Sequence, residues 1–167
     1  KGVGMFPWHQ DYPFYPHTNT DLLSVMVMLD DATPENGCMK MVRGSHKFGV
    51  LNHERVGRFV SECQDSFYWQ PPYEVVDITP RAGGISIHHA LTLHGSEANL
   101  SGRPRRGLVF SYRAADAYQL ADTIFDDTGL QISGSRSQVV RCDVGLVTLP
   151  NRGGARPYGS SWNQVGT

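Results

Sequence analysis

His9 and Asp11 lie two residues apart in the segment FPWHQDYPFYPHTN, which covers residues 6–19. The three prolines of this segment argue against a helix, because proline lacks a backbone donor and clashes with the preceding turn. In an extended chain, residues i and i+2 point to the same side. An imidazole and a carboxylate would then face one point, and a third ligand from elsewhere in the chain would complete a metal site.

Two histidines and one carboxylate on one side of a metal form the facial triad of non-haem iron oxygenases, which leaves coordination positions open. The same ligands also suit zinc, so a zinc-dependent hydrolase or isomerase stays open at this point. Several histidines could supply the third ligand, and spacing alone does not choose among them: His17, His46, His53, His88, His89 and His94.

The bulk composition indicates an ordinary globular protein. The 167 residues suffice for a single domain over 1–167, although the pattern is weaker over 116–167 and the tail 150–167 is expected to be extended. The net charge of −1 and the scattered basic residues predict no nucleic-acid partner and no membrane partner. No apolar run reaches the roughly 18 residues that a membrane span needs. Three widely spaced cysteines favour a reducing, cytoplasmic location.

The hydrophobic pattern predicts a mainly β protein. Short apolar or alternating runs are separated by turns rich in glycine and proline, which favours a sandwich or open barrel. The turn at 30–37 predicts that the first two strands form a hairpin. The expected strands cover 22–29, 38–42, 74–78, 85–94, 105–114 and 137–149.

Three blocks carry a resemblance to a known family. PWHQD, TPENGCMKMVRGSHKFG and GGISIHHALTLHGSEANLSGRPRRGLVFSYRA follow one another between Pro7 and about residue 116. Together they resemble the phytanoyl-CoA dioxygenase (PhyH) family of Fe(II)/2-oxoglutarate-dependent oxygenases. The resemblance implies a double-stranded β-helix (jelly-roll, cupin-like) core. It also implies an upstream strand and helices, so we expect this chain to lack the N-terminal part of the fold.

The resemblance also implies the site. His9, Asp11 and His94 become the catalytic metal ligands for Fe(II). An arginine eleven residues after the distal histidine, Arg105, would hold the far carboxylate of 2-oxoglutarate, and Ser96 would hydrogen-bond the same carboxylate. A planar guanidinium suits this task because it can form two parallel charge-assisted hydrogen bonds.

Arg103 and Arg106 compete with Arg105 for this role. Alternation along the strand separates Arg105 from Arg106. Arg105 falls on the face opposite an apolar row, whereas Arg106 shares the face of that row, which consists of Leu108, Phe110 and Tyr112.

The implied activity is a dioxygenase that hydroxylates an aliphatic C–H bond of a small molecule. It would consume O2 and 2-oxoglutarate and release succinate and CO2. Related halogenases have a small residue where this chain has Asp11, so the resemblance favours hydroxylation over halogenation. The alternative is a non-catalytic jelly-roll binding module that retains the fold.

Residues near the ligands are predicted to line the substrate pocket, with Arg113 pairing with an anionic substrate: Tyr12, Tyr15, His17, Tyr112 and Arg113. Two histidines precede His94 on its predicted strand. His89 matches a family histidine, and we interpret it as a residue that supports the ligands. Alternation instead places His88 on the side of His94, and the sequence leaves the choice open.

Overall fold

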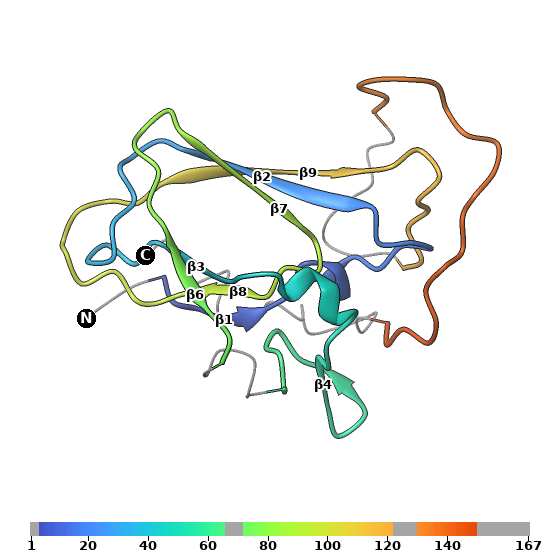
Figure 1. The fold of residues 1–167 in the computed structure, drawn as a ribbon, viewed down its shortest axis with the longest axis horizontal. Coiled ribbons are helices and arrows are strands. Elements are labelled where there is room, and N and C mark those ends of the chain that lie inside the picture. The colour runs from blue at the N-terminus through green and yellow to red at the C-terminus, as the bar shows by residue number, and fades with distance from the viewer. Residues whose placement is uncertain (1–3, 66–71, 122–129, 150–167) are drawn as a thin grey trace.

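The computed structural model describes residues 4–65, 72–121 and 130–149. Their main strands form two antiparallel sheets that lie as two layers in Figure 1. One sheet has the order β1-β8-β3-β6, from Phe6–His9, His94–Ser96, Met39–Val42 and Val75–Ile78. The other has the order β7-β2-β9, from Ile85–His89, Leu22–Met28 and Gly107–Arg113. This arrangement confirms the predicted mainly β, jelly-roll fold.

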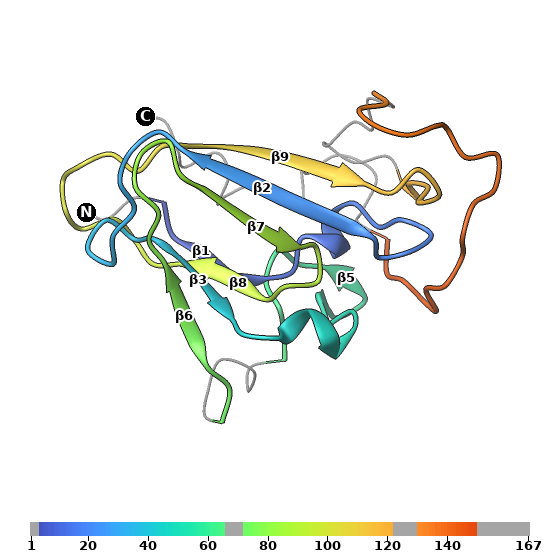
Figure 2. The same cartoon turned by 45° about the horizontal axis from the view of Figure 1, so that its top comes forward.

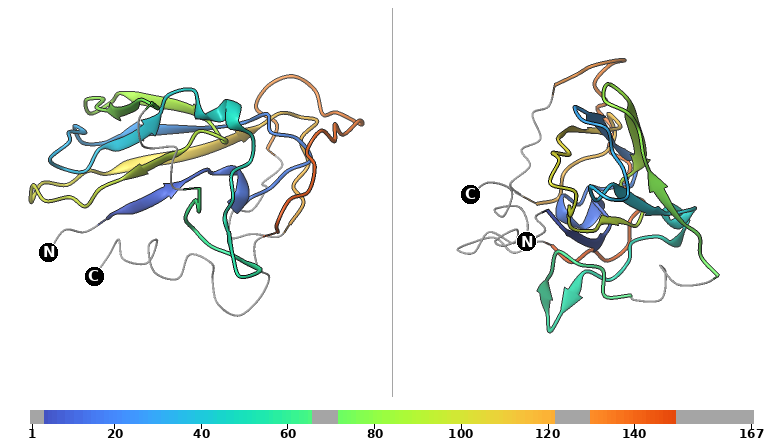
Figure 3. Two further views of the ribbon diagram at one scale, coloured as in Figure 1. Left: turned by 60° about the horizontal axis from the view of Figure 1, so that its bottom comes forward. Right: turned by 90° about the vertical axis from the view of Figure 1, so that its left-hand side faces the viewer.

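Short elements extend from the sheets. Two single-turn 3-10 helices are η1 (Tyr12–Phe14) and η2 (Ser45–Phe48). A small hairpin pairs β4 (Glu54–Arg55) with β5 (Arg58–Phe59), and it projects away from the two layers in the right-hand view of Figure 3. No helix among the described residues is long and apolar enough to cross a membrane.

The hairpin predicted from the turn at 30–37 is wrong. β2 pairs with β7 and β9, whereas β3 pairs with β6 and β8, so the connection crosses from one layer to the other (Figure 2). Asn36 organises this connection, because its side-chain oxygen accepts a hydrogen bond from the Thr33 amide at 2.8 Å. Gly37 follows with a φ of 73°, where a side chain would collide with the backbone of Glu97. The turn residues were correctly located, but they connect two sheets.

The single strand predicted over 85–94 is also wrong. β7 ends at His89, and β8 begins only at His94 in the other sheet. The intervening residues cross the space between the layers and bury Leu91 and Leu93 in two separate core clusters. The apolar residues that suggested a continuous strand therefore serve as core residues of the crossing.

The strand predicted over 137–149 does not form, since no strand occurs in residues 130–149. This segment runs past the ends of both sheets, orange in Figure 1. Arg141 connects this segment to the rest of the fold. Its Nε donates a hydrogen bond to Asp116 Oδ2 at 3.1 Å, and its Nη2 forms an ion pair with Asp21. The ion pairs of Arg141 and isolated backbone hydrogen bonds, such as that from Asp143 N to Thr18 O at 3.1 Å, hold the segment in place of sheet pairing. The prediction for the tail at 150–167 lies outside the described residues.

Candidate metal centre

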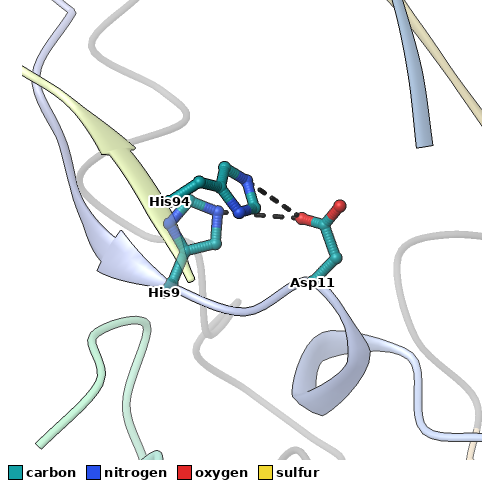
Figure 4. Close-up of side chains that lie close together, drawn as sticks. All are labelled: His9, Asp11 and His94. Atoms are coloured by element: carbon teal, nitrogen blue, oxygen red, sulfur yellow. Dashed lines mark ion pairs between the residues drawn. The ribbon is translucent and has the colours of Figure 1, made fainter. Parts of the chain in front are cut away.

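His9, Asp11 and His94 come together between the layers. The Nε2 atoms of His9 and His94 lie 3.7 and 3.5 Å from the same carboxylate oxygen, Asp11 Oδ1. The two rings are 4.2 Å apart between centroids, and the three ligand atoms lie within 4.8 Å of one another. Figure 4 shows both histidines directed at one side of the carboxylate. The three groups can therefore share one metal ion.

Backbone carbonyls orient both imidazoles. His9 Nδ1 donates to Pro7 O at 2.7 Å, and His94 Nδ1 donates to Thr92 O at 2.8 Å. Each ring therefore presents an unprotonated Nε2 to the metal position. Burial lowers the pKa of His9, and it lowers the pKa of His94 to about 3. Both side chains are thus neutral imidazoles, the form that binds metals.

Asp11 reaches this position by a turn. The extended conformation expected for the segment ends at His9, and Asp11 has α-helical dihedrals (φ −70°, ψ −40°) immediately before η1. Pro13 in η1 explains the turn, because its ring presets φ for a helical start. Burial would raise the pKa of Asp11, but His94, a hydrogen bond from His88, and His9 together hold this pKa well below its usual range. Asp11 is therefore an ionised ligand.

The second oxygen of Asp11 faces the other sheet. Ser24 Oγ donates to Asp11 Oδ2 at 2.6 Å, and His88 Nε2 lies 3.2 Å from the same oxygen. The geometry thus brings His88 to the site, while His89 accepts a hydrogen bond from the Leu91 amide at 3.0 Å. Sequence reasoning missed Ser24. Its signal was a single hydroxyl inside the otherwise apolar run of β2.

Gln10, between the first two ligands, is a second residue that sequence reasoning missed. Its side chain is fully buried. Nε2 donates to Gly49 O at 2.9 Å and to Leu91 O at 2.7 Å, and Oε1 accepts from the Leu51 amide at 2.8 Å. All its polar atoms are satisfied, so Gln10 fixes the ligand-bearing turn to two neighbouring segments.

Arg105 and Arg106 diverge as alternation predicted. Arg105 extends between the layers, where Nε donates to Asn36 O at 3.2 Å, and it lines a narrow pocket with Met39 and Ser86. Arg106 instead forms an exposed ion pair with Asp30 at 2.9 Å. Of these two arginines, Arg105 therefore lies between the sheets and Arg106 lies at the surface.

Comparison with known proteins decides the family. The model of the phytanoyl-CoA dioxygenase (PhyH) family matches residues 1–107. The chain belongs to the PhyH family.

Several known proteins and solved structures are similar to this chain. A protein named "Probable alpha-ketoglutarate-dependent hypophosphite dioxygenase" from Stutzerimonas stutzeri is 40% identical over 86% of this chain and 51% of the relative. A methylphosphonate hydroxylase from Gimesia maris is 28% identical over 75% of this chain and 46% of the relative. The epimerase SnoN, solved with Fe3+, alpha ketoglutarate and nogalamycin RO, is 25% identical with a TM-score of 0.60, covering 87% of this chain and 56% of SnoN. The chain thus spans about half the length of each of these proteins.

Unpaired polar atoms test whether the site suits the ligands of PhyH proteins. Among the residues that the structure describes, the buried side-chain atoms without a hydrogen-bond partner are Ser86 Oγ and His88 Nδ1. The two residues alternate on β7 and so share the face that contacts Asp11. A buried polar atom without a partner is costly, so a polar ligand between the sheets would offset that cost. The donor set and these two atoms fit a metal with a polar co-ligand.

Three residues predicted to contact substrate are buried beside the ligands. Tyr12 is fully buried, and its hydroxyl donates a hydrogen bond to His17 O. Burial raises the pKa of Tyr12 to about 12. His17 Nδ1 lies 2.6 Å from Tyr15 O. Tyr15 lies nearest the site, with its hydroxyl 3.4 Å from Ser24 Oγ, and burial raises its pKa. Tyr12 and His17 therefore shape the turn after the ligands, whereas Tyr15 borders Asp11 both directly and through Ser24.

Tyr112 and Arg113 lie at the end of β9. Tyr112 is paired with Leu23 and thus lies on the face of the sheet opposite to Ser24. Arg113 donates from Nη1 to Ala117 O at 2.8 Å, which holds the following loop. The structure does not bring Tyr112 to the metal position.

Proposed function

We propose that this chain carries the Fe(II)- and 2-oxoglutarate-binding centre of an oxygenase that hydroxylates a small molecule. The observation that supports this most strongly is the pairing of a neutral-imidazole and carboxylate triad with Arg105 between the same two sheets. Zinc sites use similar ligands but do not need a guanidinium in the neighbouring pocket. A guanidinium suits a carboxylate-bearing co-ligand, because it can form two parallel charge-assisted hydrogen bonds with the carboxylate.

The residues of the triad would hold the iron through His9 Nε2, His94 Nε2 and Asp11 Oδ1. The bound iron would supply the coupling between oxidation of 2-oxoglutarate by O2 and oxygenation of the substrate. The chain's own task is to present neutral imidazoles and one ionised carboxylate without rearrangement. The carbonyl hydrogen bonds of both histidines meet that need.

Arg105 would hold the far carboxylate of 2-oxoglutarate. The pocket that it lines is mostly apolar, with Met26, Met28 and Met39 among its walls, so the ion pair would form away from water. Ser86 shares this pocket, and Ser96 is paired with Met39 on the adjacent strand. Both serines are therefore candidates for the hydroxyl that hydrogen-bonds the same carboxylate.

The substrate we propose is a small phosphorus oxoanion. Support comes from relatives named for hypophosphite, methylphosphonate and 2-aminoethylphosphonate, which are 40%, 28% and 29% identical to this chain. The reaction would insert one oxygen atom of O2 into a P–H bond, or into a C–H bond next to phosphorus. The other oxygen atom would enter succinate as CO2 leaves 2-oxoglutarate.

Succinate release tests the proposal. The iron-loaded protein is incubated with O2 and 2-oxoglutarate, together with hypophosphite, methylphosphonate, 2-aminoethylphosphonate or L-proline in separate reactions. We expect succinate in proportion to oxidised product with one of the phosphorus compounds, and none with His94→Ala. Stimulation by L-proline alone would overturn the substrate class. Binding of 2-oxoglutarate without succinate from any substrate would favour the non-catalytic binding module.

A further inference from the structure

We propose that Ser24 and His88 are positioning residues that hold Asp11 as a one-oxygen metal ligand, which keeps a coordination position open. This inference rests on the proposed function of the triad as a metal centre. It assigns a role to two residues of the opposite sheet that do not themselves bind the metal.

The two residues form a matched pair. Ser24 on β2 lies directly opposite His88 on β7 in the antiparallel register, so both side chains leave the same face of the sheet. Both are buried, with 1% and 7% of their surface exposed. Both contact the same atom, Asp11 Oδ2, at 2.6 and 3.2 Å.

The lone pairs of the Asp11 carboxylate explain which of its two oxygens faces the metal. Each carboxylate oxygen has about two acceptor positions, and Ser24 and His88 both direct a donor at Oδ2. Oδ1 keeps its lone pairs and faces the Nε2 atoms of His9 and His94. A hydroxyl and an imidazole N–H can only donate to an ionised carboxylate, so His88 has its proton on Nε2. Asp11 is therefore held in an orientation with one oxygen toward the metal.

The orientation matters because the open positions are few. Two histidines and one carboxylate oxygen would leave three positions of a six-coordinate metal open, and a chelating 2-oxo acid would fill two of them. A carboxylate that rotated to bind through both oxygens would occupy the third position. Ser24 and His88 would prevent that rotation through their contacts with Oδ2, which would keep the third position open.

The pair also links the two layers. The ligands His9 and His94 belong to β1 and β8, whereas Ser24 and His88 belong to the β7-β2-β9 sheet. Tyr15 supports the pair from η1's C-terminal end, with its hydroxyl 3.4 Å from Ser24 Oγ. The orientation of the carboxylate therefore depends on both sheets.

Metal titration tests the proposal, with adjacent histidines as a matched pair. Ser24→Ala removes one donor, and His88→Phe removes the other while it keeps a ring. His89→Phe makes the same change one residue later, where the side chain faces away from Asp11. We expect the first two variants to bind Co(II) about 10- to 100-fold more weakly, as the loss of a residue behind a ligand typically does. His89→Phe should stay within about twofold of the wild type.

Two further measurements separate positioning from general destabilisation. His88→Gln restores an N–H donor and should recover most of the Co(II) affinity. Nitric oxide, used as a stand-in for O2, should bind the Fe(II)–2-oxoglutarate complex of the wild type and of His89→Phe, but with reduced occupancy in Ser24→Ala and His88→Phe. Wild-type Co(II) affinity and wild-type nitric oxide occupancy in both Ser24→Ala and His88→Phe would overturn this inference alone. Failure of the wild type to bind Co(II) would overturn the proposed metal centre as well.

Discussion

Gln10 Nε2 donates a hydrogen bond to Leu91 O at 2.7 Å, which ties the turn between the first two ligands to the segment that leads to the third. The two residues are far apart in sequence, and Gln10 is fully buried. This contact links His9 and Asp11 to His94 without a metal. The geometry of the triad is thus partly built into the protein before the ion binds.

Gln10→Leu should therefore weaken both the fold and the site. The substitution keeps a similar volume but leaves Gly49 O, Leu91 O and the Leu51 amide without their partner. We expect a loss of about 3 kcal/mol in the free energy of unfolding, measured by urea denaturation, since each unsatisfied buried group costs roughly 1–3 kcal/mol. Gln131→Leu, at an exposed glutamine, is the control and should change little. Equal stability of both variants would show that the Gln10 contacts contribute nothing.

Arg105→Ala should raise the dissociation constant of 2-oxoglutarate by at least about 10-fold, because a charge-assisted hydrogen bond contributes roughly 1.5–3 kcal/mol. The affinity for pyruvate, which has no far carboxylate, should not change. Arg106→Ala is the matched control, since its guanidinium pairs with Asp30 at the surface. Isothermal titration of the metal-loaded proteins measures both ligands. A larger effect from Arg106→Ala would show that Arg106, and not Arg105, holds the far carboxylate of 2-oxoglutarate.

Gly95 permits the close approach of β8 to β1. A side chain at this position would place its Cβ 3.0 Å from Phe6 O and 3.3 Å from Pro7 O. Gly95→Ala should therefore push the two ligand-bearing strands apart and cost about 1–3 kcal/mol of stability. Thermal unfolding, with and without Co(II), measures the effect on the fold and on the metal site. Gly145→Ala, where no atom lies within 4 Å, should be neutral.

His53 predicts a pH dependence of stability. The Nε2 atom of His53 accepts a hydrogen bond from the backbone N–H of Gln10 at 3.1 Å. Burial lowers the pKa of His53 from 6.5 to about 4. Between these two pH values the unfolded chain binds more protons than the folded one, so stability falls as the pH falls. His53→Gln should make this fall shallower by up to about 1.4 kcal/mol per pH unit.

Urea denaturation between pH 4 and 7 measures the effect. The exposed His46→Gln is the control, and the protons taken up by His9 and His94 cancel in the comparison of variants. An unchanged slope in His53→Gln would show that the pKa of His53 is the same in the folded and the unfolded chain.

Local pattern predicted some of the site and not the rest. Alternation placed Arg105 between the layers and Arg106 outside, because strand period depends only on the backbone. The same rule placed His88, and not His89, on the side of His94, and the structure brings His88 to Asp11, although the predicted continuous strand to His94 was wrong. The predicted hairpin failed because turn residues indicate where a chain reverses, and they do not indicate which sheet it enters next.

Contacts between distant segments left weaker signals. Ser24 stands in an apolar run, and nothing nearby in sequence indicates that its partner is Asp11. Gln10 looks like a spacer within HQD until the fold brings Leu91 to its amide. These residues depend on the packing of the two layers, which a single sequence does not specify locally.

The most direct test is an anaerobic titration of the protein with Fe(II) and 2-oxoglutarate, monitored by the weak visible charge-transfer band of the chelate. We predict that the band appears in the wild type and in Arg106→Ala, and that it is lost in Asp11→Ala. A wild-type protein that forms no band under these conditions, or an Asp11→Ala protein that retains it unchanged, would contradict the proposal that His9, Asp11 and His94 hold one iron.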